Sequence, residues 1–200
     1  MGCRAKCKFK HIALTLGSAS LAGIGFMMFF AHSRQRIIGF ITSLNGNSEP
    51  NIQVLQAKIG LGSGGMLGVG MGASRQSDLF LPESYGDFIF SILGEQFGLF
   101  GTTVVLIAYF ALFVIGIYIA KKSDNQYGQL LAFAISFNII ITAFINAAVV
   151  TGLMPTTGIT LPFISFGGTS ILLFSISIGI LINIANQGNR KKTMKVSLID

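Results

Sequence analysis

Four apolar segments, each about 20 residues long, constrain the fold of this chain more than any other feature. They are Ile12–Ala31, Gly98–Ala120, Gln129–Thr151 and Gly167–Asn186. With a rise of ~1.5 Å per residue, each would form a helix of ~30 Å, the hydrocarbon thickness of a bilayer. Only 10% of the residues are charged, against about 25% in a typical soluble domain. The sequence therefore predicts an all-α, polytopic transmembrane helical bundle with about four spanning helices.

The first apolar segment, Ile12–Ala31, has two interpretations. A basic leader precedes it and a polar stretch follows it, as in a secretory signal peptide. Its apolar run is longer than the ~7–15 residues of a signal-peptide core, which favours a true spanning helix. On this interpretation residues 1–200 form a single membrane domain.

The basic residues predict the orientation of the helices. Ten of the fourteen Lys and Arg residues precede the first segment or follow the second and fourth, which places them on one side of the membrane. The positive-inside rule puts that side in the cytoplasm. We therefore expect cytoplasmic tails at 1–11 and 187–200 and an extracytoplasmic loop with short helices at 32–97. The basic clusters lack the interleaved aromatic residues of nucleic-acid-binding surfaces, so no nucleic-acid partner is expected despite the net charge of +7.

The loop at 32–97 is too long to be a simple connection. Its moderately apolar piece Ile52–Leu61 is expected to form a short interfacial or re-entrant helix. The glycine-rich run Gly62–Gly72 follows, but it has neither the G-x-G-x-x-G spacing nor the lysine of a nucleotide-binding loop. Close approach of two backbones, or a bent loop at the membrane surface, is the interpretation that glycine favours here.

The segment Thr151–Ser170 between the last two apolar segments contains two prolines and four glycines, yet it is largely apolar. Pro155 and Pro162 interrupt helical geometry. Non-helical backbone at membrane depth is tolerated only against protein or a water-filled cavity. The sequence therefore predicts a partly re-entrant Gly/Pro segment.

Polar residues recur on one face of each of the last two helices. Asn138, Thr142 and Asn146 repeat every four residues, and Ser175 and Gly179 form a pair of small residues at the same spacing. Helix packing with interhelical hydrogen bonds is one explanation, and a direct substrate role for the polar residues is the other. In both cases these faces are expected to point into the bundle.

A carboxylate at the mouth of a membrane helix is costly to keep and is therefore a functional candidate. Asp87 occupies this place, where the glycine-rich loop runs into the second apolar segment. The competing interpretation is that Asp87 caps a helix that begins near Phe88.

Several of these motifs occur in the order and spacing of one known family. The chain resembles the SEDS proteins, the FtsW, RodA and SpoVE group, over about residues 10–190 and is closest to the FtsW and SpoVE branch. The residues that carry the resemblance are Gln56–Gly65, Gly68–Gly72, Ser74–Gln76, Leu81–Glu83, Gly86–Phe90, Gly94–Glu95, Asn146, Val150–Gly158 and Leu161–Ser170.

The resemblance implies a multi-pass enzyme of the bacterial cytoplasmic membrane that polymerises lipid II into peptidoglycan strands. The family has ten transmembrane helices, and this chain matches the C-terminal part of that larger bundle. The implied partners are lipid II and the nascent glycan strand, a class B penicillin-binding protein, other membrane proteins of the division machinery and membrane lipids. The alternatives from other classes are a lipid II flippase or transporter and a non-catalytic scaffold of the division machinery.

The same resemblance assigns the candidate site residues. The family's catalytic acid matches Asp87, which would accept the proton of an attacking sugar hydroxyl. Lys58, Arg75 and Arg36 are the cations available to the substrate's diphosphate, with a divalent cation (Mg²⁺ or Mn²⁺) as a further option. Arg75 has membrane headgroups as its alternative partner, and Glu83 either binds substrate or solvates the loop. The remaining residues expected to bind substrate are Ser63, Gly64, Gly65, Pro155, Ser165, Gly167 and Gly168.

Overall fold

The computed structural model describes residues 17–18, 25, 30–44, 52–72 and 86–196. It divides into two compact units, Met1–Pro50 and Asn51–Asp200. Every regular element among the described residues is a helix, which confirms the all-α class.

The first unit contributes one long described element, helix α2 (Ala31–Leu44). Thr42 and Ser43 in its last turns donate hydrogen bonds to backbone carbonyls of the same helix. The predicted first span, Ile12–Ala31, falls almost entirely outside the described residues.

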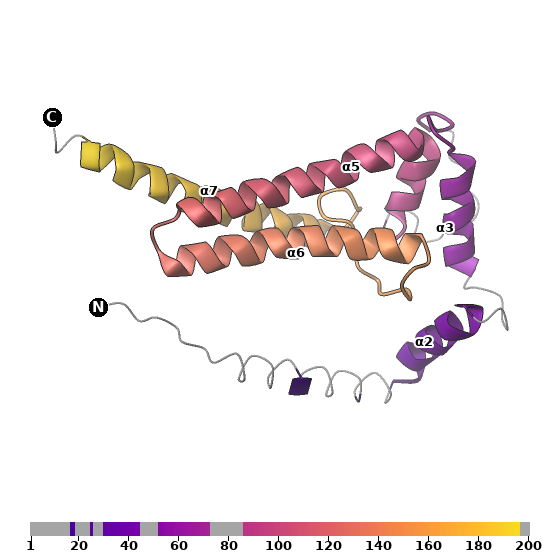
Figure 1. The fold of residues 1–200 in the computed structure, drawn as a ribbon. Coiled ribbons are helices and arrows are strands. Elements are labelled where there is room, and N and C mark those ends of the chain that lie inside the picture. The colour runs from indigo at the N-terminus through magenta and orange to yellow at the C-terminus, as the bar shows by residue number, and fades with distance from the viewer. Residues whose placement is uncertain (1–16, 19–24, 26–29, 45–51, 73–85, 197–200) are drawn as a thin grey trace. The chain divides into compact units, whose positions relative to one another are not determined.

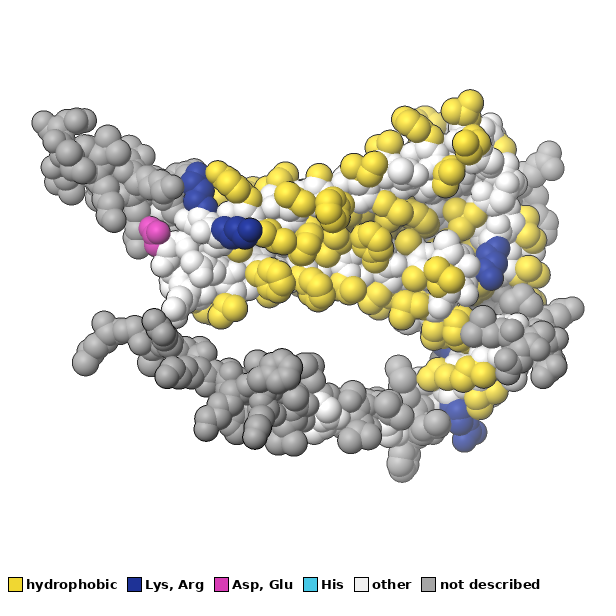
Figure 2. All heavy atoms as spheres, in the orientation of Figure 1, with side chains coloured by type: hydrophobic (Ala, Val, Ile, Leu, Met, Phe, Trp, Pro, Cys, Tyr) yellow, Lys and Arg dark blue, Asp and Glu magenta, His cyan; other side chains and the backbone are white. Residues whose placement is uncertain are grey.

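Three helices of the second unit are long and apolar enough to cross a membrane. They are α5 (Ile89–Lys122), α6 (Gln126–Val150) and the stretch Gly168–Gln187 of α7, which itself runs over Gly168–Val196. Figure 2 shows hydrophobic side chains along the length of these helices and charged side chains where α5 ends and α6 begins. The chain is therefore a multi-pass membrane protein, and three of its four predicted spans are confirmed.

Helix α5 begins at Ile89, well before the predicted start at Gly98. Gly98 has φ 66° and ψ −165°, so it breaks the helix into a short first segment and a long second one (Figure 1). The predicted boundary is wrong because it marks this break rather than the end of a loop. The first segment is buried against α3 (Ile52–Ser63), where Ser91 Oγ donates a 2.7 Å hydrogen bond to Ala57 O. The short helix expected at Ile52–Leu61 is thus present as α3.

The glycine-rich run after α3 satisfies the backbone groups that the break in α5 leaves without helical partners. Backbone carbonyls at the end of the first α5 segment accept hydrogen bonds from Val69 N and Gly70 N, at 2.9 and 3.1 Å. Amides at the start of the second segment donate to Gly65 O and Met66 O, at 2.9 and 3.2 Å. Because buried backbone groups need partners, the run acts as a cap for both segments. The predicted close approach of two backbones is confirmed.

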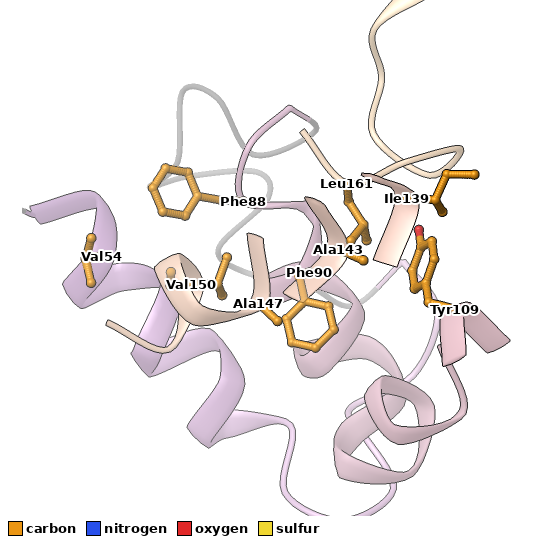
Figure 3. Close-up of a cluster of buried hydrophobic side chains, with 10 residues drawn as sticks. Val54, Phe88, Phe90, Tyr109, Ile139, Ala143, Ala147, Val150 and Leu161 are labelled. Atoms are coloured by element: carbon orange, nitrogen blue, oxygen red, sulfur yellow. The ribbon is translucent and has the colours of Figure 1, made fainter. Parts of the chain in front are cut away.

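The segment between α6 and α7 folds back against the bundle rather than running straight across its end (Figure 1). Leu161 is fully buried, and the hydroxyl of Tyr109, far along α5 from its break, donates a hydrogen bond to Pro162 O. In Figure 3 the Leu161 and Tyr109 side chains lie in one cluster with Ala143 and Ile139 of α6. This arrangement confirms a partly re-entrant Gly/Pro segment.

The polar faces of α6 and α7 only partly follow the prediction. Asn146 is 1% exposed, but Asn138 on the same face is exposed, and so are Ser175 and Gly179 on α7. Within the described residues, burial confirms the expectation that these faces point into the bundle only at the C-terminal end of α6. Helix α7 packs lightly against the other described helices, with only 11% of its apolar stretch buried, so for its polar face the expectation stays a prediction.

Candidate functional site

Asp87 lies in a turn immediately before α5, and it is not the helix cap. The N-cap of α5 is Phe88, whose backbone has φ −105° and ψ 13°, and no side chain makes a capping hydrogen bond there. Phe88 is 3% exposed, whereas Asp87 is half-buried. The buried Phe88 ring fixes the backbone next to Asp87, which itself stays partly exposed.

The re-entrant segment forms one wall beside this carboxylate. Asp87 Oδ2 lies 3.6 Å from the position that a Cβ atom on Gly158 would occupy. Gly158 has φ 73°, a left-handed conformation that glycine adopts without strain. A side chain at residue 158 would therefore begin in van der Waals contact with the carboxylate, whereas glycine leaves that space unfilled.

Two side chains hold the backbone on which Asp87 sits. Asn146 Nδ2 donates a 2.8 Å hydrogen bond to Asp87 O, and Ser165 Oγ donates a 2.7 Å hydrogen bond to Gly86 O. Ser165 is fully buried, and its oxygen also accepts from Leu161 N at 2.7 Å. The structure thus brings the predicted residue Ser165 to Asp87 through the backbone, as part of the support of the site.

Lys58 lies on α3 with its side chain over the end of α6. Its Cε and Nζ atoms occupy the space next to Gly152, which follows α6 and has φ 73°. The C-terminus of a helix carries partial negative charge, so an ammonium group there stabilises the helix end. Lys58 is also exposed, which leaves this cation available to an anionic ligand.

The predicted residues at the end of α3 have different surroundings. Gly64 contacts the backbone of α5 so closely that a Cβ atom on it would overlap the carbonyl oxygen of Gly94. Ser63 Oγ donates to Gly60 O at 2.9 Å within its own helix. Gly65 differs, because it lines an apolar groove of about 520 Å³ together with Leu61 and residues of α5.

Three of the other predicted residues lie on described parts of the second unit. Gly167 and Gly168 are at the start of α7, where Gly167 O accepts hydrogen bonds from Ile171 N and Ser170 Oγ at 3.0 and 2.9 Å. Pro155 is half-buried in the segment that follows α6. Arg36 belongs to α2 in the other unit, and Arg75 and Glu83 fall outside the described residues.

Two buried polar residues were not assigned to the site from the sequence. Glu95 falls within the predicted loop at 32–97, yet it is 3% exposed within the first segment of α5. For Asn146, helix packing and a direct substrate role were both left open. The available signal for Glu95 was its place inside an apolar helical run, where a carboxylate is costly.

The described residues contain no group of three or more His, Cys, Asp or Glu side chains arranged to hold a metal ion. A magnesium ion in a phosphate-transfer site is often held by only one or two carboxylates together with substrate phosphates. The single carboxylate of Asp87 fits that mode of binding and does not fit a site made by protein ligands alone.

Comparison with known families gives one match that covers most of the chain. The FtsW, RodA and SpoVE family model, described as "Cell cycle protein", matches residues 3–190. A protein of Geobacter sp. (strain M18) named "Probable peptidoglycan glycosyltransferase FtsW" is 37% identical over 175 residues, which are 87% of this chain and 48% of that protein. "Stage V sporulation protein E" of Bacillus subtilis (strain 168) is 39% identical over 171 residues, 85% of this chain and 47% of that protein.

Among solved structures, one chain from a peptidoglycan synthase complex that coordinates polymerization and crosslinking has a similar fold. The TM-score is 0.63 with 19% sequence identity, and the likeness covers 90% of this chain and 50% of that chain. The chain therefore spans about half the length of the curated relatives and of the solved chain that it matches.

Proposed function

The chain belongs to the FtsW, RodA and SpoVE family, and we propose that it forms the catalytic part of a peptidoglycan polymerase that uses lipid II. The observation that carries the proposal is the placement of Asp87. Its half-buried carboxylate lies beside a glycine at the mouth of a spanning helix, and its backbone is held from two other elements. The name of the relative from Geobacter sp. (strain M18), a probable peptidoglycan glycosyltransferase, supports the same activity.

The proposed reaction transfers a disaccharide-peptide from undecaprenyl diphosphate to a growing glycan strand. A sugar hydroxyl attacks the anomeric carbon of a sugar that is linked to undecaprenyl diphosphate. The new C–O bond forms as the bond to the diphosphate breaks, and the electron pair leaves with the diphosphate. Asp87 accepts the hydroxyl proton as general base. One carboxylate suffices, because a diphosphate leaving group needs neutralisation of its charge more than protonation, unlike the leaving group of a glycosidase.

The proposed orientation puts Asp87 on the outer side of the cytoplasmic membrane and both ends of the chain in the cytoplasm. The pair Lys121 and Lys122 at the end of α5 supports it, because basic residues favour the cytoplasmic side. Lipid II polymerised on the outer face would be passed to a class B penicillin-binding protein for crosslinking. The solved complex with a similar fold supports a partner of this kind.

The first test is a lipid II polymerisation gel. Residues 3–190 would replace the matching part of a full-length relative, and the class B penicillin-binding protein of that relative would be present with its crosslinking activity blocked by penicillin. Glycan strands from this chimera, at a rate near that of the relative, would support the polymerase. A folded chimera that makes no strands beside an active relative would contradict it. Lipid II flipping without strands would instead favour a transporter, and neither activity would favour a scaffold.

Lys58 is expected to contact the substrate's diphosphate. Replacing Lys58 with methionine keeps most of its apolar stem and removes the charge, so we expect KM for lipid II to rise about tenfold, whereas Lys58→Arg should stay within about threefold of wild type. Steady-state kinetics on the chimera would measure both. An unchanged KM in Lys58→Met, together with a lower melting temperature, would limit Lys58 to stabilising the end of α6.

A divalent cation is proposed to share the neutralisation of the diphosphate, held by the substrate and the Asp87 carboxylate. Removal of divalent cations with EDTA is then expected to lower the polymerisation rate at least tenfold, and Mg²⁺ or Mn²⁺ should restore it. The melting temperature of the protein without substrate should not change. Full activity in EDTA would assign the neutralisation to basic side chains alone.

A further inference from the structure

The side-chain amide of Asn146 joins two backbone segments that are far apart in the sequence. Its Nδ2 donates one hydrogen bond to Asp87 O at 2.8 Å and another to Ile159 O at 2.7 Å. A primary amide nitrogen carries two N–H donors, so both are used. Asn146 is 1% exposed, so the side chain that makes both hydrogen bonds is itself buried, and a buried donor left without these acceptors would be costly.

The residue before Asp87 is tied to the same re-entrant segment. Ser165 Oγ donates to Gly86 O and accepts from Leu161 N, both at 2.7 Å. Two consecutive carbonyls, those of Gly86 and Asp87, are therefore held by side chains from two different elements. The position of the Asp87 backbone depends on these two bonds.

The re-entrant segment is itself firmly held. Pro162 O accepts a hydrogen bond from Tyr109, and Leu161 is fully buried. Phe163 has φ 64°, a conformation that costs roughly 1–2 kcal/mol for a residue with a side chain. Such a conformation persists only where its surroundings enforce it, and the Phe163 ring packs 5.6 Å from that of Phe174. The wall beside the Asp87 carboxylate is thus a fixed surface.

The side-chain oxygen of Asn146 argues against the alternative that this residue only fills space in the core. Asn146 Oδ1 is buried and has no hydrogen-bond partner among the described residues. An unpaired buried oxygen is unfavourable, and an apolar side chain of similar size would avoid that cost. The two N–H donors are the property that an apolar residue does not supply.

The geometry points to Asn146 as a positioning residue that sets the Asp87 carboxylate against the re-entrant wall, and this inference rests on the proposed role of Asp87 as general base. A base acts only within hydrogen-bond reach of the proton it accepts. A displacement of about 1 Å can lower a rate about 100-fold. Because the Asn146 amide binds the backbone of both residue 87 and residue 159, it fixes the position of the Asp87 carboxylate relative to the re-entrant segment.

The kinetic test compares the same substitution at two positions of α6. Asn146→Ala in the full-length chimera is expected to lower kcat about 10- to 100-fold per folded protein, with KM for lipid II within about threefold of wild type. Asn138→Ala, at an exposed position on the same helix face, should keep the wild-type kcat. Ser165→Ala should lower kcat in the same way, and it provides the kinetic test if Asn146→Ala does not fold. A wild-type kcat in folded Asn146→Ala would overturn the inference.

A second measurement does not depend on polymerase activity. In a chimera without other cysteines, Asp87→Cys would be labelled with a membrane-impermeant maleimide. Adding Asn146→Ala should raise the labelling rate at least fivefold, because the backbone at residue 87 loses its anchor, and adding Asn138→Ala should not change it. Equal labelling rates with Asn146→Ala and with Asn138→Ala would refute the positioning role, even if the wild-type chimera made no glycan strands. An inactive wild type with a raised labelling rate would refute only the proposed function.

Discussion

Replacing Asp87 with asparagine is expected to abolish glycan strand synthesis while the protein stays folded. Asparagine has the same shape as aspartate but does not accept a proton at neutral pH, so the general-base contribution of about 10²- to 10⁴-fold is lost. The hydrogen bonds that hold residue 87 go to its backbone carbonyl, so the substitution leaves them in place. The rate of strand formation on a lipid II gel, at equal amounts of folded chimera, measures the effect.

The matched control is Asp124→Asn. Asp124 is an exposed carboxylate in the turn between α5 and α6, at the opposite end of α5 from Asp87. The same loss of one negative charge there should leave the polymerisation rate unchanged. A rate in Asp87→Asn above about a tenth of wild type, with the control unaffected, would mean that another group accepts the proton.

Hydropathy was sufficient to predict the spanning helices but not their internal breaks. The segment predicted as Gln129–Thr151 corresponds to α6 at Gln126–Val150, because a long apolar run has few other ways to satisfy its backbone in a membrane. Helix α5 was misplaced at its start because Gly98 interrupts the helix, whereas Glu95 and Gln96 before it looked like loop residues. A break that is capped by a distant glycine-rich run leaves no local signal.

The candidate site was predictable only in part for a related reason. Asp87 was identified from its place before an apolar helix and from the family resemblance. The contacts of Asn146 and Ser165 depend on carbonyl groups more than fifty residues away in the chain. Every residue has a backbone carbonyl, so no pattern of residue types predicts which carbonyl a side chain will bind. The packing contact of Gly64 was not predictable for the same reason, since a glycine that contacts backbone looks the same in sequence as one that lines a groove.

Two alanine substitutions, Gly62→Ala near the end of α3 and Gly64→Ala just after it, are expected to change stability in opposite directions. In Gly64→Ala, the new methyl group would overlap Gly94 O and lie 2.9 Å from Glu95 Cα, so α3 must move away from α5. We expect a loss of about 3 kcal/mol, the upper part of the range for overpacking, because backbone atoms yield less than side chains. In Gly62→Ala, nothing lies within 4 Å of the new methyl group, and better helix propensity should add about 0.5–1 kcal/mol. Melting temperatures in detergent, followed by size exclusion, measure both.

The same pair of variants distinguishes packing from substrate binding at Gly64. If Gly64 binds substrate and has no packing role, Gly64→Ala should raise KM for lipid II while its melting temperature matches that of Gly62→Ala. If Gly64 sets the distance between α3 and α5, Gly64→Ala should lower the melting temperature. It should also displace Lys58, because Lys58 lies on α3 with its side chain next to Gly152. Gly64→Ala, which removes no charge, would then weaken the contact between Lys58 and the substrate's diphosphate, the same contact that Lys58→Met removes. Adding Lys58→Met to Gly64→Ala should raise KM by less than it does in the wild type, because the contact that it removes is already weakened.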